Sequence, residues 1–335
     1  MSLNVGIVGC GGIGKTHARQ YQKHKDVSLK CFVDIDKARA DAAAKEFGIK
    51  AYYSIAEMLK AEQLDAVSVA TAGAENGGHH YEPTIQCLEA GLHVLCEKPI
   101  SNEIEQGRQM VAKAKQAGKL LGIDLNHRFT PMSARAKGWI VEGKLGEGMF
   151  LNMVMWINNK NETSPYFHIK ALHPHSLDIV RYFAGKVKRV QCFMSKPSTR
   201  KVCWANLSLN MEFENGMVGH LTGSYEMGMQ YGIERCEYAG TKGRFVLDNM
   251  FELLTYYPRE GDEMTVVKNN IFGQGASFEL TFQNRIHRWV DQVIAKTPWE
   301  QVEANGDDGL AASEIIHAAI ESFEGNSVVD LKGRG

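Results

Sequence analysis

The chain has 335 residues, of which 44% are hydrophobic, and a formal net charge of −1 at pH 7. This length predicts about two domains with real cores, and the balanced charge predicts neither a nucleic-acid partner nor an anionic membrane partner. The seven cysteines include no C-x-x-C pair, so we expect buried thiols in a reduced, cytoplasmic protein. We recognise no signal peptide and no apolar run long enough to span a bilayer.

The first 124 residues alternate short apolar strands with helices joined by short links. This alternation predicts a parallel, doubly wound α/β sheet. Ligands of such sheets bind beyond the carboxyl ends of the strands, so we expect the loops there to form one cleft. The expected strands are Val5–Val8, Ser28–Val33, Asp65–Ala70, His93–Cys96 and Leu120–Leu125. The expected helices, with Ser54 and Ser101 as N-caps, are Lys15–His24, Lys37–Phe47, Ile55–Leu59, His80–Ala90 and Glu103–Ala117.

A glycine-rich turn, G-x-G-x-x-G, follows the first strand and opens the first helix. Gly9 permits the tight turn, Gly11 lets a pyrophosphate approach the backbone, and Gly14 lets the helix pack close to the strand. Asp34 follows the second strand, where a carboxylate binds a ribose and repels the 2′-phosphate of NADP. We therefore expect an NAD site, although such a turn also occurs in other α/β proteins. The expected cofactor-binding residues here are Gly9, Gly11, Gly12, Ile13, Gly14 and Asp34.

Beyond residue 124 the pattern changes to strand-like runs joined by hairpin signals such as Glu214-Asn215-Gly216. This pattern predicts a largely antiparallel second domain over residues 125–335. The expected strands are Met149–Ile157, Val187–Met194, Cys203–Phe213, Gly219–Tyr225, Ile233–Tyr238, Arg244–Leu247, Leu253–Tyr257 and Met264–Val267. The expected helices are Met132–Glu142, Ala171–Tyr182, Phe278–Ala295 and Asp308–Phe323.

Several further motifs occur in a fixed order along nearly the whole chain. Besides the glycine turn, they are AGLHVLCEKPI at Ala90–Ile100, HRFTP at His127–Pro131, HPHSLDIVRYFAG at His173–Gly185 and EYAGTKG at Glu237–Gly243. With these motifs the chain resembles the Gfo/Idh/MocA group, which includes sugar and inositol dehydrogenases. The resemblance implies a Rossmann domain that binds NAD and an α+β domain with a large open, mainly antiparallel sheet. It also implies a homo-dimer or homo-tetramer formed through that sheet.

The resemblance implies two catalytic residues, Lys98 and His175. The Lys98 ammonium would contact the substrate oxygen that becomes a carbonyl, and His175 would be the general base, since histidine titrates near neutral pH. The group usually carries an acid one turn before this histidine and another three residues after it. Here the later acid is Asp178, but the earlier position is Ala171, which leaves the proton transfer open. Without the resemblance, a surface lysine and a packed helix histidine are the simpler interpretations.

Other residues are assigned to the two sides of the expected cleft. Those assigned to the cofactor are Thr71, His80, Glu97, Lys98 and Arg128, and those assigned to the substrate are Lys98, Asn126, Trp156, His168, His173 and His175. For some of them an alternative stays open: Arg128 as an interface salt bridge, Trp156 as a core residue and Glu97 as a residue that orients Lys98. A zinc site of His168, His173 and His175 is a weaker alternative, because Pro174 interrupts the spacing. We expect no metal.

These observations predict an oxidoreductase that transfers hydride from a secondary hydroxyl of a sugar, an inositol or a sugar derivative to NAD. One alternative is an NAD-dependent glycoside hydrolase or lyase that works through transient oxidation. Another is a non-catalytic, nucleotide-sensing regulator on the same fold.

Overall fold

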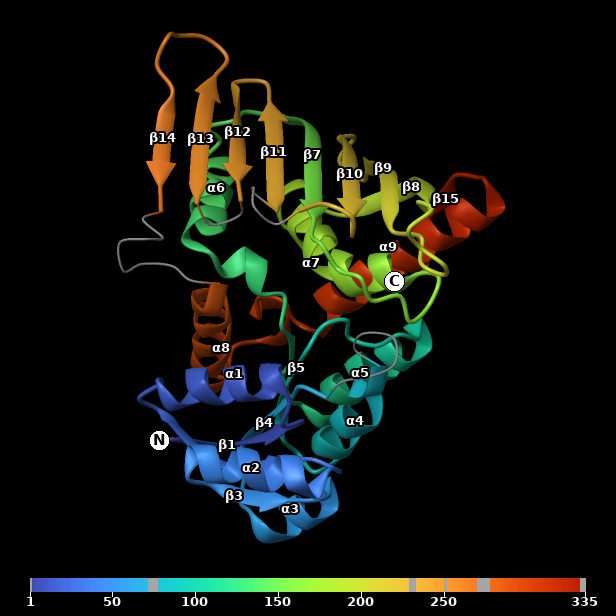
Figure 1. The fold of residues 1–335 in the computed structure, drawn as a ribbon. Helices are drawn as coiled ribbons and strands as arrows, with labels where there is room; N and C mark the ends of the chain where they lie inside the picture. Colours follow the sequence, from blue (N-terminus) through green and yellow to red (C-terminus); the bar gives the residue numbers. More distant parts are fainter. Residues whose placement is uncertain (1, 72–77, 229–232, 250–251, 270–277, 332–335) are drawn as a thin grey trace. The chain divides into compact units, whose positions relative to one another are not determined.

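The structure is a computed structural model, and it describes residues 2–71, 78–228, 233–249, 252–269 and 278–331 (Figure 1). The chain divides into two compact units. Unit 1 comprises Met1–Leu125 and Phe278–Leu310, and unit 2 comprises Asn126–Ser277 and Ala311–Gly335. The first division lies next to the predicted boundary after residue 124. Residues 278–310, predicted to belong to the second domain, return to unit 1.

Unit 1 contains a six-stranded parallel sheet in the order β3-β2-β1-β4-β5-β6. The strands are β1 (Leu3–Val8), β2 (Val27–Val33), β3 (Lys50–Tyr52), β4 (Ala66–Val69), β5 (His93–Cys96) and β6 (Leu121–Ile123). The helical segments are α1 (Gly12–Gln22), α2 (Lys37–Phe47), α3 (Ile55–Ala61), η1 (Gly78–His80), α4 (Tyr81–Glu89), α5 (Ile104–Ala117), α8 (Phe278–Ile294) and η3 (Trp299–Gln301). The doubly wound α/β fold is confirmed. The strand order reverses between β1 and β4, which is where such sheets bind ligands.

Three local predictions for unit 1 differ from the structure. Helix α1 begins at Gly12 rather than Lys15, and the short edge strand β3 was not predicted. Helix α5 has Glu103, not Ser101, at its N-cap. The Ser101 hydroxyl instead accepts a hydrogen bond from the Glu103 backbone N–H at 3.2 Å and donates one to Gln106 at 2.9 Å. A serine that bonds the backbone two residues ahead forms a local turn before the helix.

Helix α8 belongs to unit 1 because its apolar face completes the core of that unit. Trp289 and Ile286 are fully buried and share a cluster with Tyr21 of α1. The buried Arg285 donates hydrogen bonds from Nε to the Ile123 carbonyl at 3.0 Å and from Nη2 to the Ala304 carbonyl at 2.9 Å. These contacts join α8 to the end of β6. The sequence prediction placed this helix in the second domain because it follows the antiparallel strands along the chain.

Unit 2 contains a nine-stranded sheet in the order β14-β13-β12-β11-β7-β10-β9-β8-β15. Each neighbouring pair is antiparallel except β7 and β10, which run parallel. The strands are β7 (Gly148–Trp156), β8 (Val187–Ser195), β9 (Asn206–Phe213), β10 (Val218–Ser224), β11 (Glu234–Gly240), β12 (Gly243–Asp248), β13 (Leu253–Pro258), β14 (Thr265–Lys268) and β15 (Val329–Asp330). The helical segments are η2 (Asn126–Phe129), α6 (Pro131–Val141), α7 (Phe167–Ala184) and α9 (Gly306–Gly325), of which α9 also contributes to unit 1. The predicted mainly antiparallel sheet is confirmed.

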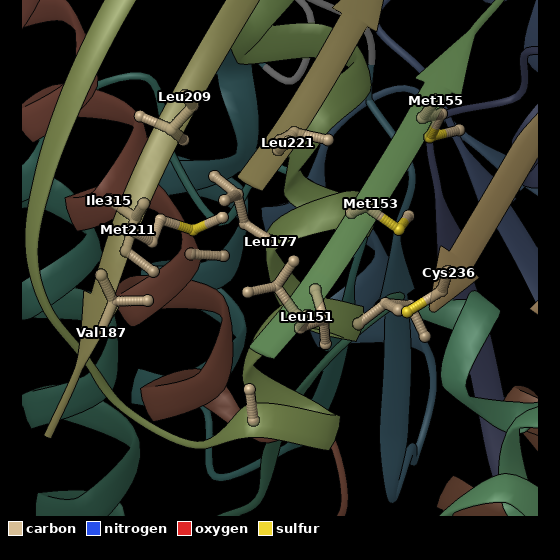
Figure 2. Packing of buried hydrophobic residues seen from close by; sticks show 14 of the residues in the cluster. Leu151, Met153, Met155, Leu177, Val187, Leu209, Met211, Leu221, Cys236 and Ile315 are labelled. Atoms are coloured by element: carbon tan, nitrogen blue, oxygen red, sulfur yellow. The ribbon is translucent and has the colours of Figure 1, made fainter. Parts of the chain in front are cut away.

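One face of this sheet packs against helices and forms the core of unit 2. Figure 2 shows Leu151, Met153 and Met155 of β7 pointing toward the same layer as Leu177 of α7 and Ile315 of α9. Buried and more exposed residues alternate along β7 and β9, as expected for strands with one covered face.

The prediction of buried thiols agrees with the structure. All seven cysteines are free and buried. Within the described part of the chain, we find no helix with the length and apolar character needed to cross a bilayer.

The packing around Gly122 of β6 predicts a specific loss of stability. A Cβ atom at this position would lie 2.6 Å from both Trp289 Cδ1 and Arg285 Nη2. We expect Gly122→Ala to lower the free energy of unfolding by about 1–3 kcal/mol, as in other overpacked cores, measured by denaturant unfolding. Gly138→Ala in α6 is the matched control, because the nearest atom to its Cβ is 3.8 Å away. Equal destabilisation by both substitutions would contradict this account.

Candidate active site

The glycine turn between β1 and α1 has the shape needed for a dinucleotide. Gly9 has a φ of +100°, and a Cβ there would lie 2.5 Å from the Ala70 carbonyl oxygen. A Cβ on Gly14 would lie 1.9 Å from the Gly9 carbonyl oxygen. By contrast, no atom lies within 4 Å of a Cβ built on Gly11 or Gly12. Packing thus requires glycine at positions 9 and 14. Gly11 and Gly12 leave open space at the helix N-terminus, where backbone N–H groups attract phosphate.

Asp34, directly after β2, is tied to this turn. Its Oδ2 accepts a hydrogen bond from the Cys10 N–H at 2.9 Å, and its Oδ1 accepts one from the Asp36 N–H at 2.9 Å. Arg39 Nη1 lies 3.7 Å from Oδ2. The carboxylate is therefore held in a fixed orientation beside the turn, and each oxygen keeps a second lone pair to accept a ribose hydroxyl. The turn and Asp34 together fit an adenine dinucleotide.

Thr71 and His80 connect the end of β4 to the segment that carries Lys98. The His80 ring is buried, with Nδ1 2.8 Å from the Pro99 carbonyl oxygen and Nε2 3.1 Å from the Thr71 carbonyl oxygen. Burial lowers the pKa of His80, although both carbonyls oppose this effect. In this arrangement His80 fixes the backbone at both strand ends. Residues 72–77 of the predicted cofactor loop lie outside the described part of the chain.

A buried charged cluster links α1 to the carboxyl ends of three strands. His17 Nε2 lies 3.0 Å from Glu97 Oε1 after β5 and 3.0 Å from Asp124 Oδ2 after β6. Its Nδ1 lies 2.7 Å from the hydroxyl of Ser68 in β4. Burial alone would lower the pKa of His17, but the two carboxylates outweigh it and raise this pKa to about 9. Burial and the charge of Asp124 raise the pKa of Glu97.

His17 and Asp124 were not predicted as part of the site. His17 lies in helix α1, shortly after the last glycine of the turn, and Asp124 directly follows an apolar strand. For Asp124, a polar residue at a strand end was the available signal. Among the described residues, this cluster is the group of side chains suited to a metal ion. The raised pKa of His17 favours an imidazolium, whose Nε2 has no lone pair to offer a metal.

Lys98 follows Glu97 at the same edge of the sheet as the glycine turn. Its backbone N–H donates a hydrogen bond to Glu97 Oε2 at 3.1 Å, and its side chain is half-buried. Burial lowers the pKa of the Lys98 ammonium, while the charges of Glu97 and Asp124 act in the opposite direction. The N–H hydrogen bond holds the backbone of Lys98 against the Glu97 carboxylate.

In unit 2, His175 of α7 is stacked on His127 of η2. The two ring centroids are 4.0 Å apart, and the ring planes differ by 1°. His127 Nδ1 lies 2.8 Å from Oε2 of Glu234, the first residue of β11. His175 is 8% exposed, and the other two side chains are buried more deeply. This group brings together a predicted catalytic residue and two residues that were not predicted.

Arg128 is paired within unit 2. Its Nε donates a hydrogen bond to Asp178 Oδ2 at 2.8 Å, and its Nη2 contacts the other oxygen of the same carboxylate. The guanidinium also lies over the Tyr182 ring, 5.2 Å from its centroid. Such a bidentate pair orients both side chains. Arg128 therefore has an ion-pair partner, Asp178, on α7. Asn126, which lies in η2 like Arg128, is buried.

His168 and His173 are core residues. Both are fully buried, and their Nε2 atoms lie 3.0 Å apart. Burial lowers the pKa of His168 to about 3 and that of His173 well below its usual value. These side chains expose no polar atom, which argues against their predicted substrate contacts. His175 faces His127 instead, so the three histidines do not form the zinc site considered from the sequence.

Two other predicted positions lie outside this histidine cluster. Ala171 is buried one turn before His175. Because the residue is an alanine, this position offers no carboxylate. Trp156 is half-buried at the end of β7, on the strand position after the core residue Met155. Because side chains alternate along a strand, Trp156 points away from the core, contrary to its interpretation as a core residue.

The His17 cluster predicts how stability depends on pH. A histidine whose pKa is raised from 6.5 to about 9 stabilises the fold fully below pH 6.5, and this contribution is lost as the pH rises through 9. The contribution is on the order of 3 kcal/mol. We expect His17→Gln to be less stable than the wild type at pH 6 and to lose less stability by pH 9, measured by denaturant unfolding. Parallel pH profiles would contradict this, and His220→Gln on β10 is the control.

Comparison with known proteins supports this description of both units. The model of an oxidoreductase family with an NAD-binding Rossmann fold matches residues 3–125, and that of the GFO/IDH/MocA C-terminal domain matches residues 134–246. D-glucoside 3-dehydrogenase of Escherichia coli (strain K12) is 28% identical over 98% of this chain and 97% of its own length. Myo-inositol 2-dehydrogenase of Thermotoga maritima is 26% identical over 98% of this chain and 99% of its own length.

A solved structure of levoglucosan dehydrogenase in complex with NADH and levoglucosan has a TM-score of 0.89 to this chain. The alignment covers 98% of this chain and 99% of that one, with 21% identity, and shows a shared fold. The family matches span the Rossmann fold of unit 1 and most of the sheet of unit 2. The chain therefore belongs to the GFO/IDH/MocA family of NAD-binding oxidoreductases, with NAD as its cofactor.

Proposed function

We propose that this protein oxidises a secondary hydroxyl of a sugar, an inositol or a sugar derivative, with Lys98 and His175 as catalytic residues. Its full-length similarity to a glucoside dehydrogenase and an inositol dehydrogenase supports this substrate class. The observation that carries the proposal is a half-buried lysine at the same sheet edge as an NAD-type glycine turn. A positive charge at this edge suits an alcohol that becomes a carbonyl.

The residues proposed to hold the cofactor are Gly9–Gly14 at the phosphates and Asp34 at the ribose. NAD, when bound, accepts a hydride from the carbon that is oxidised. The fixed carboxylate of Asp34 accepts hydrogen bonds from ribose hydroxyls and repels an additional phosphate, so the site favours NAD over NADP.

Lys98 is proposed to stabilise the negative charge that develops on the substrate oxygen. An ammonium held in a partly buried site is not reoriented by solvent, so its interaction with an oxyanion is stronger than in water. The hydrogen bond from the Lys98 N–H to Glu97 fixes the backbone from which the side chain extends. His175 is proposed to take the hydroxyl proton, because histidine ordinarily changes charge close to neutral pH.

A second candidate is an NAD-dependent glycoside hydrolase or lyase that oxidises its substrate transiently. The observation behind this candidate is Ala171, one turn before His175. It stands where the family usually carries an acid, so the proposed base lacks that neighbouring carboxylate. A panel of sugars, inositols, sugar acids and glycosides incubated with NAD separates the two. Net accumulation of NADH supports the dehydrogenase, and release of the aglycone without NADH supports the second candidate.

We expect Lys98→Met to lower kcat by about 10²–10³-fold or more, the usual effect of losing one oxyanion-stabilising group. NAD affinity should change little, because the glycine turn is intact, and titration calorimetry measures this. Lys113→Met, on the surface of α5, is the matched control and should leave kcat unchanged. Retention of wild-type turnover by Lys98→Met would exclude the proposed role.

The outer face of the unit 2 sheet is proposed to join copies of the chain. Phe193 of β8 and Val218 of β10 are 50% and 56% exposed in the single chain, and exposed apolar side chains on a large sheet favour association. We expect light scattering to give the mass of a dimer or tetramer. Phe193→Lys should reduce that mass, whereas a wild-type monomer would contradict this proposal.

A further inference from the structure

We propose that His17 is a positioning residue for Lys98, which it holds through the Glu97 carboxylate. This inference rests on the proposed role of Lys98 at the substrate oxygen. The arrangement lies wholly within unit 1: α1 carries His17, and Glu97 and Lys98 directly follow β5. A histidine on the helix that follows the glycine turn thus determines where the backbone of the lysine lies.

The two carboxylate oxygens of Glu97 connect His17 with Lys98. Oε1 lies 3.0 Å from His17 Nε2, and Oε2 accepts a hydrogen bond from the Lys98 backbone N–H at 3.1 Å. An ionised carboxylate only accepts hydrogen bonds, so Nε2 of the histidine is the donor. Rotation of the Glu97 carboxylate would disturb both bonds, because its two oxygens move together. His17 therefore fixes the orientation of the acceptor to which the Lys98 backbone is bound.

The His17 ring is itself held at both of its nitrogens. Nδ1 lies 2.7 Å from the hydroxyl oxygen of Ser68 in β4, and Nε2 also lies 3.0 Å from Asp124 Oδ2 after β6. The ring has no exposed surface, so bulk water does not compete for these contacts. A ring bound at both nitrogens does not turn freely, and it is therefore a rigid support for the Glu97 side chain.

His17 also helps to keep the Glu97 carboxyl group ionised. Burial and the charge of Asp124 raise the pKa of Glu97, whereas the hydrogen bond and the charge of His17 lower it. An ionised carboxylate binds an N–H group more strongly than a neutral carboxyl group does. Burial lowers the pKa of the Lys98 ammonium, and the charges of Glu97 and Asp124 oppose this effect. His17 thus supports both the backbone position and the charge of Lys98.

Helix α1 places His17 at a fixed distance from the glycine turn. The helix begins at Gly12, and His17 lies about 7.5 Å further along the helix axis. Gly14 keeps this helix close to the turn, since a Cβ there would lie 1.9 Å from the Gly9 carbonyl oxygen. The proposed phosphate site and Lys98 are therefore positioned by the same helix. Hydride transfer requires such alignment, because a small displacement of a reacting group slows the reaction strongly.

The test compares His17→Leu and His17→Gln with His24→Gln. Leucine removes both ring nitrogens, whereas glutamine keeps a side-chain N–H donor for Glu97. His24 is the matched control, because it is a buried histidine just beyond the end of α1 that contacts Asp291 at 3.3 Å rather than Glu97. Hydrogen exchange of the Lys98 amide, followed by NMR in protein labelled with ¹⁵N-lysine, reports on the bond to Glu97 without requiring a substrate.

We expect His17→Leu to speed exchange of the Lys98 amide about tenfold, the order expected when a hydrogen bond to a charged group is lost. Its kcat should fall by up to about 10²-fold, as for a catalytic group displaced by roughly 1 Å, whereas KM for NAD should change little. His17→Gln should recover part of both effects, and His24→Gln should match the wild type. Titration calorimetry with NAD counts the binding-competent sites, and a merely structural role would leave kcat per site unchanged.

Unchanged exchange of the Lys98 amide in folded His17→Leu would overturn the inference. Faster exchange without a fall in kcat per site would also overturn it, as would equal effects in His24→Gln. If His17→Leu does not fold, Ser68→Ala replaces it, since it removes the partner of His17 Nδ1; faster exchange is again expected, and unchanged exchange again overturns the inference. Failure of the substrate panel would contradict the proposed function alone, and the exchange rates would still test whether His17 positions Lys98.

Discussion

A buried imidazolium between two carboxylates holds together the edge of the Rossmann sheet on which the proposed chemistry depends. His17 joins helix α1 to the ends of β5 and β6 through Glu97 and Asp124. The same carboxylate of Glu97 accepts the backbone N–H of Lys98. Because all three groups are buried, loss of one would leave another without its partner. The helix that follows the glycine turn and the lysine after β5 are therefore fixed by one network.

The same physical device recurs in unit 2. Glu234 lies against His127 as the two carboxylates lie against His17, and His127 in turn supports His175. In both places an acid in or directly after a strand lies against a histidine from a helical segment. His168 and His173 show the contrast: their rings face each other, and burial lowers the pKa of both. The partner, rather than the residue type, decides what a buried histidine does.

Local patterns were sufficient for the Rossmann fold and for the cofactor. Apolar strands that alternate with helices predicted the parallel sheet, and the glycine spacing with Asp34 predicted the turn that the structure shows. Local patterns failed where distant segments meet. Helix α8 was assigned to the second domain because it follows the antiparallel strands, whereas its buried Trp289 and Arg285 complete unit 1. Ser101 has the residue type of an N-cap, but its hydroxyl accepts a hydrogen bond from the backbone N–H of Glu103, which is itself the N-cap residue.

The sequence by itself determined the family, the doubly wound α/β sheet, the antiparallel second domain and the preference for NAD, because each depends on residues close together in the chain. Only the tertiary structure decided how the histidines divide. The contacts of His17, His127 and Glu234 have no local signal, since their partners are 51 to 107 residues away. Hydrogen bonds and ion pairs between such residues form only when the sheets assemble, and burial then sets which groups are charged.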